Sequence, residues 1–234
     1  MHVPDGFLDA PTSLATGLIA AAGIAVALRG TRRELDDRTA PMAGLVATFV
    51  FAAQMINFPV GAGTSGHLMG GALAAVLVGP WSAVLCLSVV LLVQGLMMAD
   101  GGITALGTNI TLMGLVTVAV GWTTFVLMRR VLAARPTAVP IAAAVGAFLS
   151  VPAAALVFTL LFSVGGQAPV DLSRVVVAML GWHTLIGLGE AAVTGLVVAS
   201  VIATRPDLVY GARPLLAVPT LEIRTPAPDP ETTR

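Results

Sequence analysis

The chain has 234 residues, of which 57% are hydrophobic and only 10% are charged, and its formal net charge is zero at pH 7. Soluble domains carry about 25% charged residues. With a mean hydropathy of +0.95, the composition therefore predicts an integral membrane protein. Lysine is absent, which excludes a P-loop ATPase and any enzyme that uses its own lysine as a Schiff base.

Apolar stretches follow one another along the chain and predict an all-α, polytopic membrane protein with seven transmembrane helices. The predicted spans cover approximately residues 12–28, 41–58, 66–79, 81–99, 108–128, 137–163 and 175–203. Only Gly79 and Pro80 separate the third stretch from the fourth. The pattern of hydrophobicity at this point allows either one kinked helix or two helices joined by a turn.

The arginines decide between these two readings. They gather after the first, fifth and seventh stretches, as Arg29, Arg32, Arg33 and Arg38, then Arg129, Arg130 and Arg135, and finally Arg205 and Arg213. The positive-inside rule places all three clusters in the cytoplasm. An even number of crossings must then separate the first two clusters, which requires a real turn at Gly79-Pro80. The N-terminus is accordingly predicted outside and the C-terminus inside.

The C-terminal region differs from the rest. Residues 212–234 contain five prolines and scattered charges, a composition typical of chain that does not pack into a core. We therefore predict one membrane-embedded domain over residues 1–211, followed by a proline-rich, disordered cytoplasmic tail over 212–234.

The first two residues provide three nitrogen donors close together. The amine of Met1, the backbone amide of His2 and the imidazole of His2 can close adjacent five- and six-membered chelate rings around one divalent ion. Such a set suits a metal that prefers square-planar geometry, and it leaves one position for a fourth ligand. Because chain termini are usually frayed, the pattern needs support from elsewhere in the sequence.

That support comes from the predicted topology. His67 opens the third stretch on the outer face, where Met1 also lies, and His183 and Glu190 fall in the outer half of the last stretch. His183 and Glu190 are seven residues apart and share one helix face. Each also has a structural interpretation: His67 as an interfacial or capping residue, His183 as part of an aromatic belt, and Glu190 as an interhelical hydrogen-bonding group.

Two glycine-rich polar segments, 57–67 and 99–109, connect stretches on the outer face. Irregular backbone of this kind is tolerated where it packs in protein or lines a wet cavity. These segments are predicted either to close over a bound ion or to serve as ordinary connections. Among the polar residues, Gln54, Gln94, Asn57 and Asn109 also fit interhelical polar pairs.

Several of these segments together resemble the CbiM/NikM family, the substrate-binding membrane components of energy-coupling-factor transporters for cobalt and nickel. The resemblance rests on residues 1–8, 57–71, 99–109 and 183–190 and extends over residues 1 to 211. It implies seven transmembrane helices and a Co²⁺ or Ni²⁺ ion held in a square-planar set of nitrogens.

The resemblance also implies roles for single residues. The metal donors would be the Met1 amine, the His2 amide and imidazole, and the His67 imidazole. The remaining candidates would support the site without holding the ion, or serve the fold alone; they are Asn57, Ser65, Asn109, His183 and Glu190.

The implied function is capture of extracellular Co²⁺ or Ni²⁺ for uptake across the cell membrane, supplying cobalamin biosynthesis or nickel enzymes. The chain would not be an enzyme and would need no catalytic cofactor. Its partners would be a transmembrane T component, two ATPase subunits that hydrolyse ATP, a small two-helix membrane subunit and the lipid bilayer, with no nucleic acid. The choice between cobalt and nickel stays open.

Two other functions are compatible with parts of the sequence. One is a metal-dependent intramembrane enzyme that uses His67, His183 and Glu190, although no His-Glu-x-x-His pattern occurs. The other is a binding component for an organic vitamin, against which the aromatic content of only 5% counts.

Overall fold

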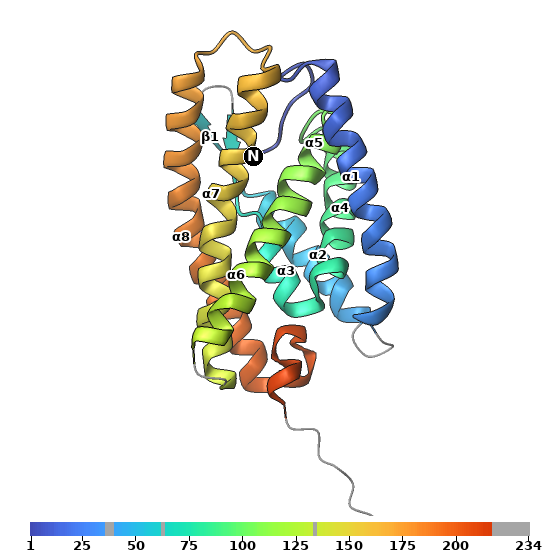
Figure 1. Ribbon diagram of the computed structural model, residues 1–234, viewed down its shortest axis with the longest axis vertical. Helices are drawn as coiled ribbons and strands as arrows, with labels where there is room; N and C mark the ends of the chain where they lie inside the picture. The colour runs from blue at the N-terminus through green and yellow to red at the C-terminus, as the bar shows by residue number, and fades with distance from the viewer. Residues whose placement is uncertain (36–39, 62–63, 133–134, 217–234) are drawn as a thin grey trace, which may run out of the picture.

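The computed structural model describes residues 1–35, 40–61, 64–132 and 135–216, and it shows a bundle of long helices lying side by side (Figure 1). The helices are α1 (Ala10–Gly30), α2 (Ala40–Gln54), α3 (Gly71–Val78), α4 (Pro80–Met97), α5 (Leu106–Asn109), α6 (Thr117–Val131), α7 (Val139–Gly165) and α8 (Leu172–Thr204). A π-helical segment, Ile110–Val116, joins α5 to α6, and short 3-10 turns cover Thr31–Arg33, Pro136–Ala138, Pro206–Leu208 and Tyr210–Leu215. The predicted helical class is confirmed.

Among the described residues, five helical segments are long and apolar enough to cross a membrane, which makes the chain a multi-pass membrane protein. They are Ala10–Arg33, Pro80–Met97, Leu106–Val131, Val139–Gly165 and Leu172–Thr204. Helix α2 is apolar but has 15 residues. Helix α3 has 8 residues, and at 1.5 Å per residue it covers about 12 Å of a hydrocarbon core that is about 30 Å thick. The predicted third span over 66–79 is therefore shorter than expected, and the count of seven spans stays a prediction.

The predicted turn between the third and fourth stretches is confirmed. Gly79 has a φ of 97° and separates the end of α3 from the start of α4 at Pro80. The carboxylate of Glu34 accepts hydrogen bonds from the backbone N–H groups of Trp81 at 3.1 Å and Ser82 at 2.7 Å. Proline in the first helical position and an anion at the helix N-terminus both favour a new helix here.

The arginine-bearing ends of the helices gather at one end of the bundle. Arg129, near the end of α6, donates to the carbonyl of Gly211 at 2.6 Å, and Arg213 donates to the carbonyl of Glu34, just beyond α1, at 3.0 Å. Figure 1 shows this end opposite the one at which α1 begins. Arg38 lies outside the described residues.

The predicted boundary at residue 211 falls within an ordered turn. Ala212 is fully buried, and the 3-10 turn Tyr210–Leu215 packs against the bundle. Most of the predicted tail, residues 217–234, lies outside the described residues.

One segment that the sequence presents as an irregular loop forms a small hairpin. Strands β1 (Phe58–Gly61) and β2 (Thr64–Gly66) pair antiparallel, with Phe58 opposite Gly66. The hairpin replaces the end of the predicted second span and the start of the third. It leads directly into His67, which precedes α3 instead of opening it.

The buried core has two clusters, one toward each end of the bundle. One cluster is built around Val76, Phe125 and Val198. The other surrounds Met69, Phe158 and Met179, and it includes four residues from the N-terminal segment: Met1, Val3, Phe7 and Leu8. The first residues of the chain are thus part of the hydrophobic core.

Candidate metal centre

The N-terminal segment is inserted into the bundle, as Figure 1 shows. Met1 is 1% exposed, His2 is 7% exposed and Val3 is 1% exposed. The general tendency of termini to fray therefore does not apply to this chain. The donors that the sequence places at positions 1 and 2 lie in the protein interior.

Val3 is the point at which this segment is held most firmly. Its N–H donates to Oδ1 of Asn109 at 2.8 Å, and its carbonyl accepts from Nδ2 of the same side chain at 3.2 Å. The N–H of Gly102 donates to the same carbonyl at 2.9 Å. These bonds fix the backbone next to His2, so the predicted candidate Asn109 positions the segment.

Two further contacts fasten the residues that follow. The carboxylate of Asp5 accepts from the N–H of Thr104 at 2.8 Å and from its hydroxyl at 2.5 Å. The carbonyl of Phe7 accepts from the N–H of Gln167, in the connection between α7 and α8, at 3.0 Å. The segment is thereby tied to two separate loops, one after α4 and one between α7 and α8.

The amine of Met1 meets the imidazole of His67. The two nitrogens, Met1 N and His67 Nε2, are 2.5 Å apart. His67 Nδ1 lies 2.8 Å from the carbonyl of Leu68, and because a carbonyl can only accept, Nδ1 must carry the ring proton. His67 Nε2 therefore presents its lone pair toward the amine.

The imidazole of His2 lies beside that of His67, with ring centroids 4.6 Å apart and 29° between the ring planes. His2 Nε2 is 3.1 Å from the side-chain oxygen of Gln94 in α4. With the amide oxygen placed there, Nε2 carries the proton and Nδ1 keeps its lone pair. His2 Nδ1 lies 3.2 Å from Oδ1 of Asp100 without the geometry of a hydrogen bond.

Burial keeps these groups neutral. Desolvation lowers the pKa of the Met1 amine from 8.0 to about 4, and the nearby Asp100 carboxylate opposes that shift. Burial likewise lowers the pKa of His2 and of His67, and for both the Met1 amine lowers it further. At neutral pH all three groups present lone pairs, which is the form that binds a metal ion.

The backbone just after His67 is clamped from two sides. The carboxylate of Glu190 in α8 accepts from the N–H of Met69 at 2.5 Å and of Gly70 at 2.7 Å. The side chain of Gln54 in α2 donates to the carbonyl of Met69 at 2.7 Å. Glu190 therefore holds the turn that follows His67, and its role in supporting a metal site stays a prediction.

The other predicted candidates occupy different positions. His183 is fully buried in α8 and donates from Nδ1 to the carbonyl of Met179 at 2.8 Å, while its Nε2 has no hydrogen-bond partner among the described residues. Asn57 and Ser65 line a pocket that His2 also lines.

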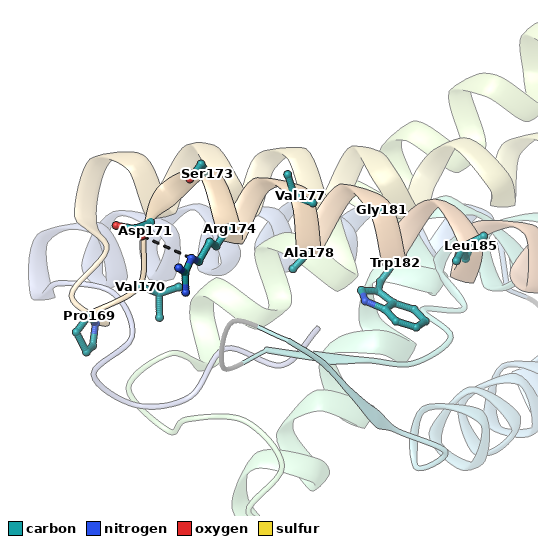
Figure 2. A pocket seen from close by; sticks show the side chains of 10 residues that line it. All are labelled: Pro169, Val170, Asp171, Ser173, Arg174, Val177, Ala178, Gly181, Trp182 and Leu185. Atoms are coloured by element: carbon teal, nitrogen blue, oxygen red, sulfur yellow. Dashed lines mark ion pairs between the residues drawn. The ribbon is translucent and has the colours of Figure 1, made fainter.

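That pocket has a volume of about 440 Å³. The described residues that line it are His2, Pro4, Asn57, Pro59, Gly61, Thr64, Ser65, Asp100 and Gly101. A larger hollow of about 1080 Å³ runs along the first half of α8, past the Asp171–Arg174 ion pair and Trp182 (Figure 2). Of the candidate donor residues, His2 lines the smaller pocket, and none of them is among the residues that line the larger one.

Two residues at the site, Gln94 and Asp100, were not predicted from the sequence to take part in metal binding. Gln94 fits an interhelical polar pair by its pattern, yet it sets the tautomer of His2. Asp100 is one polar residue in a glycine-rich connection, and only the fold brings it beside His2. A carboxylate directly after an apolar span was the one available signal for Asp100.

The chain matches known metal transport proteins over most of its length. Residues 2–208 match the family model CbiM, described as the cobalt uptake substrate-specific transmembrane region. A cobalt transport protein CbiM of Sorangium cellulosum is 35% identical over 89% of this chain and 94% of its own length. A putative fused nickel transport protein NikMN of Archaeoglobus fulgidus is 40% identical over 89% of this chain and 68% of its own length.

A solved structure has the same fold. The crystal structure of a truncated transition metal transporter superposes with a TM-score of 0.81 at 29% identity, covering 87% of this chain and 99% of that one. These relatives are transport proteins and not enzymes. Together with the match to residues 2–208, they show that this chain is a multi-pass membrane component of cobalt or nickel transport and belongs to the CbiM family.

Proposed function

We propose that this chain captures Co²⁺ or Ni²⁺ on the outer side of the cell membrane and holds it in a square plane of four nitrogens. The donors are the Met1 amine, the His2 amide after loss of its proton to solvent, His2 Nδ1 and His67 Nε2. The chelate leaves one corner of the plane open, opposite the amide, and His67 fills it.

One observation carries this proposal: the distance of 2.5 Å between Met1 N and His67 Nε2. With metal–nitrogen bonds of about 2.0 Å, neighbouring donors in a square plane lie about 2.8 Å apart. The amine and His67 are neighbours in the proposed arrangement. Both imidazoles also carry their protons on the nitrogens that face away from the proposed ion, which is the usual way protein ligands are oriented.

The proposed orientation puts the arginine-bearing end of the bundle in the cytoplasm. The candidate centre lies in the other half, with its pocket open to the outside. Seven membrane passes fit this arrangement if each of the short helices α2 and α3 counts as one pass. The ion then enters from outside, and release to the cytoplasm requires the component to rearrange.

We propose that this rearrangement is driven by a transmembrane T component and two ATPase subunits of an energy-coupling-factor transporter. A small membrane subunit completes the assembly. The match to fused NikMN proteins, of which this chain covers 68% in the Archaeoglobus fulgidus relative, supports a second component alongside the part that this chain represents. The imported ion would supply cobalamin biosynthesis or nickel enzymes.

The affinity order of divalent metals favours nickel over cobalt at one and the same nitrogen site. The proposal is therefore that both ions bind and that Ni²⁺ binds more tightly. Organic vitamins are disfavoured as substrates because the four proposed donors are nitrogens that converge on one point, and because the relatives are named for nickel and cobalt transport.

Elemental analysis of the purified protein after exposure to equal Co²⁺ and Ni²⁺ tests the proposal. The native protein is expected to retain metal, mostly nickel, and His67→Ala is expected to retain little. His183→Ala is the matched control, because it removes a buried imidazole outside the four-donor set. Equal metal content in the native protein and His67→Ala would rule the site out.

A further inference from the structure

Asp100 connects the outer pocket to the candidate centre. Its side chain is 17% exposed and lines the pocket, while Oδ1 lies 3.2 Å from His2 Nδ1, whose own side chain is 3% exposed. The other oxygen, Oδ2, lies 3.5 Å from the side-chain nitrogen of Asn57 at the pocket wall. Asp100 is the only carboxylate among the described residues that line this pocket.

The contact between Asp100 and His2 brings two electron-rich atoms together. His2 Nδ1 has no hydrogen-bond partner among the described residues, and its proton is on Nε2, which faces Gln94. A lone pair and a carboxylate oxygen at 3.2 Å repel each other unless a positive charge lies beside both. The arrangement is suited to a cation next to Nδ1.

The net charge of the proposed metal complex also points to Asp100. A divalent ion and one deprotonated amide leave a single positive charge, because the Met1 amine and the two imidazoles are neutral. An uncompensated charge in a buried site is costly. The Asp100 carboxylate is the described anion in contact with this donor set, and it makes the site neutral.

The backbone is shaped to place this carboxylate. Ala99 is the one non-glycine residue with a positive φ, 52°, in the part of the chain that the structure describes. This conformation turns the chain at the end of α4, and the N–H of Asp100 then donates to the carbonyl of Gln94 at 3.0 Å. Backbone strain of this kind persists where surrounding contacts fix it and is concentrated at functional sites.

Resting on the proposed function, we propose that Asp100 receives the hydrated divalent cation in the outer pocket and remains beside the bound ion as its counter-charge, outside the plane of the four nitrogens. The carboxylate attracts the ion into the pocket and hands it to His2 Nδ1, 3.2 Å away. It speeds entry and strengthens retention without replacing a nitrogen donor. A carboxylate in a narrow cleft raises the local cation concentration in this way.

Stopped-flow and calorimetric measurements of Ni²⁺ binding to the purified, full-length protein test this role. Asp100→Asn keeps the size of the side chain and removes its charge, and Asp100→Glu keeps the charge. Asp171→Asn is the matched control, because it removes an exposed carboxylate that pairs with Arg174 outside the pocket. The absorption spectrum of bound Ni²⁺ reports whether the nitrogen plane is unchanged.

Asp100→Asn is expected to weaken Ni²⁺ binding by about 10- to 100-fold, the usual effect of removing a group that supports a metal site from outside the ligand set. Its association rate should fall and become less sensitive to salt, while the spectrum of the bound ion stays that of the native protein. Asp100→Glu should recover most of the affinity, and Asp171→Asn should match the native protein.

Three results would overturn the inference: native rate and affinity in Asp100→Asn, equal impairment in Asp100→Glu, or an altered spectrum in Asp100→Asn. Absence of Ni²⁺ and Co²⁺ binding in the native protein would instead overturn the proposed function, and this inference with it. Metal binding by the native protein therefore distinguishes failure of the proposed function from failure of the inference about Asp100.

Discussion

Asn109 holds the backbone of Val3 through both ends of its side-chain amide, at 2.8 Å and 3.2 Å. The two residues are 106 positions apart, yet this pair fixes the position of His2 and, through it, of the Met1 amine. The proposed chelate at the terminus depends on this hold, because Val3 directly follows His2 and Asn109, at the end of α5, fixes its backbone.

Replacing Asn109 with leucine should release this hold. The variant removes both hydrogen bonds and leaves the buried N–H of Val3 without a partner, so the inserted position of the segment loses stability. We expect Ni²⁺ affinity to fall about 10- to 100-fold, measured by calorimetry. Gln167→Ala is the control, because the hydrogen bond from Gln167 to Phe7 comes from its backbone N–H and survives the substitution; if both variants bind equally well, Val3 does not need Asn109.

Gly102 has no room for a side chain. A Cβ at this position would overlap the backbone and carboxylate of Asp5. Gly102→Ala should therefore displace the N-terminal segment and abolish most metal binding, with a much smaller effect on the melting temperature. In Gly189→Ala the added methyl group meets open space, so metal binding should be retained; normal binding in Gly102→Ala would show that the segment tolerates displacement.

Glu190 is expected to support both protein stability and metal affinity by holding the turn that follows His67. In Glu190→Gln one carboxylate oxygen becomes an NH₂ group, which faces a backbone N–H donor and cannot accept from it. Loss of such a buried bond costs about 1–3 kcal/mol, so thermal unfolding should occur at a lower temperature and metal affinity should fall. Thr194→Val, one turn along α8, removes a hydroxyl with no partner among the described residues and should have little effect. Equal melting temperatures for the two variants would argue against this clamp.

Acid should release the N-terminal segment. Burial lowers the pKa of the Met1 amine from 8.0 to about 4, and a released segment would regain the higher value. The released form then binds more protons between these two values, so insertion is strongest at pH 8 and above and weakens as the pH falls toward 4. Hydrogen exchange at the Val3 amide, corrected for the intrinsic rate, should show less protection at pH 5 than at pH 8; equal or greater protection at pH 5 would contradict this linkage.

The helical class could be predicted because apolar runs define the long helices. The turn at Gly79-Pro80 was predicted from the placement of the arginine clusters, because the local pattern also allowed one kinked helix. The bonds of Arg129 and Arg213 join arginine-bearing segments at one end of the bundle, and the cytoplasmic position of this end stays a prediction. The short α3 and the hairpin before it were missed, because hydropathy measures the length of an apolar run and not where hydrogen bonding changes from helix to strand.

Within the site, the sequence identified residue types better than contacts. His2 and His67 were candidates by chemistry, and their predicted role as metal ligands stays a prediction. Asn109 and Glu190 were predicted to support the site or to serve the fold alone, and the structure shows which backbone groups each one holds. Asp100 was missed, because its role depends on the backbone turn at Ala99 and on a partner 98 positions away, at His2. Long-range packing of this kind has no local signature.

In the proposed site the Met1 amine itself binds the metal ion. Equilibrium dialysis with Ni²⁺ should compare the native protein with a form that carries two alanines before Met1, each N-terminus verified by mass spectrometry. Two are needed, because a single added residue would place His2 third in the chain, where the new amine, two amides and the imidazole can themselves chelate Ni²⁺ in a square plane. The extension turns the Met1 amine into an amide and adds a carbonyl group beside His67 Nε2, which lies 2.5 Å from Met1 N. We expect tight binding by the native protein and loss of binding by the extended form; native affinity in the extended form would contradict the role of the Met1 amine.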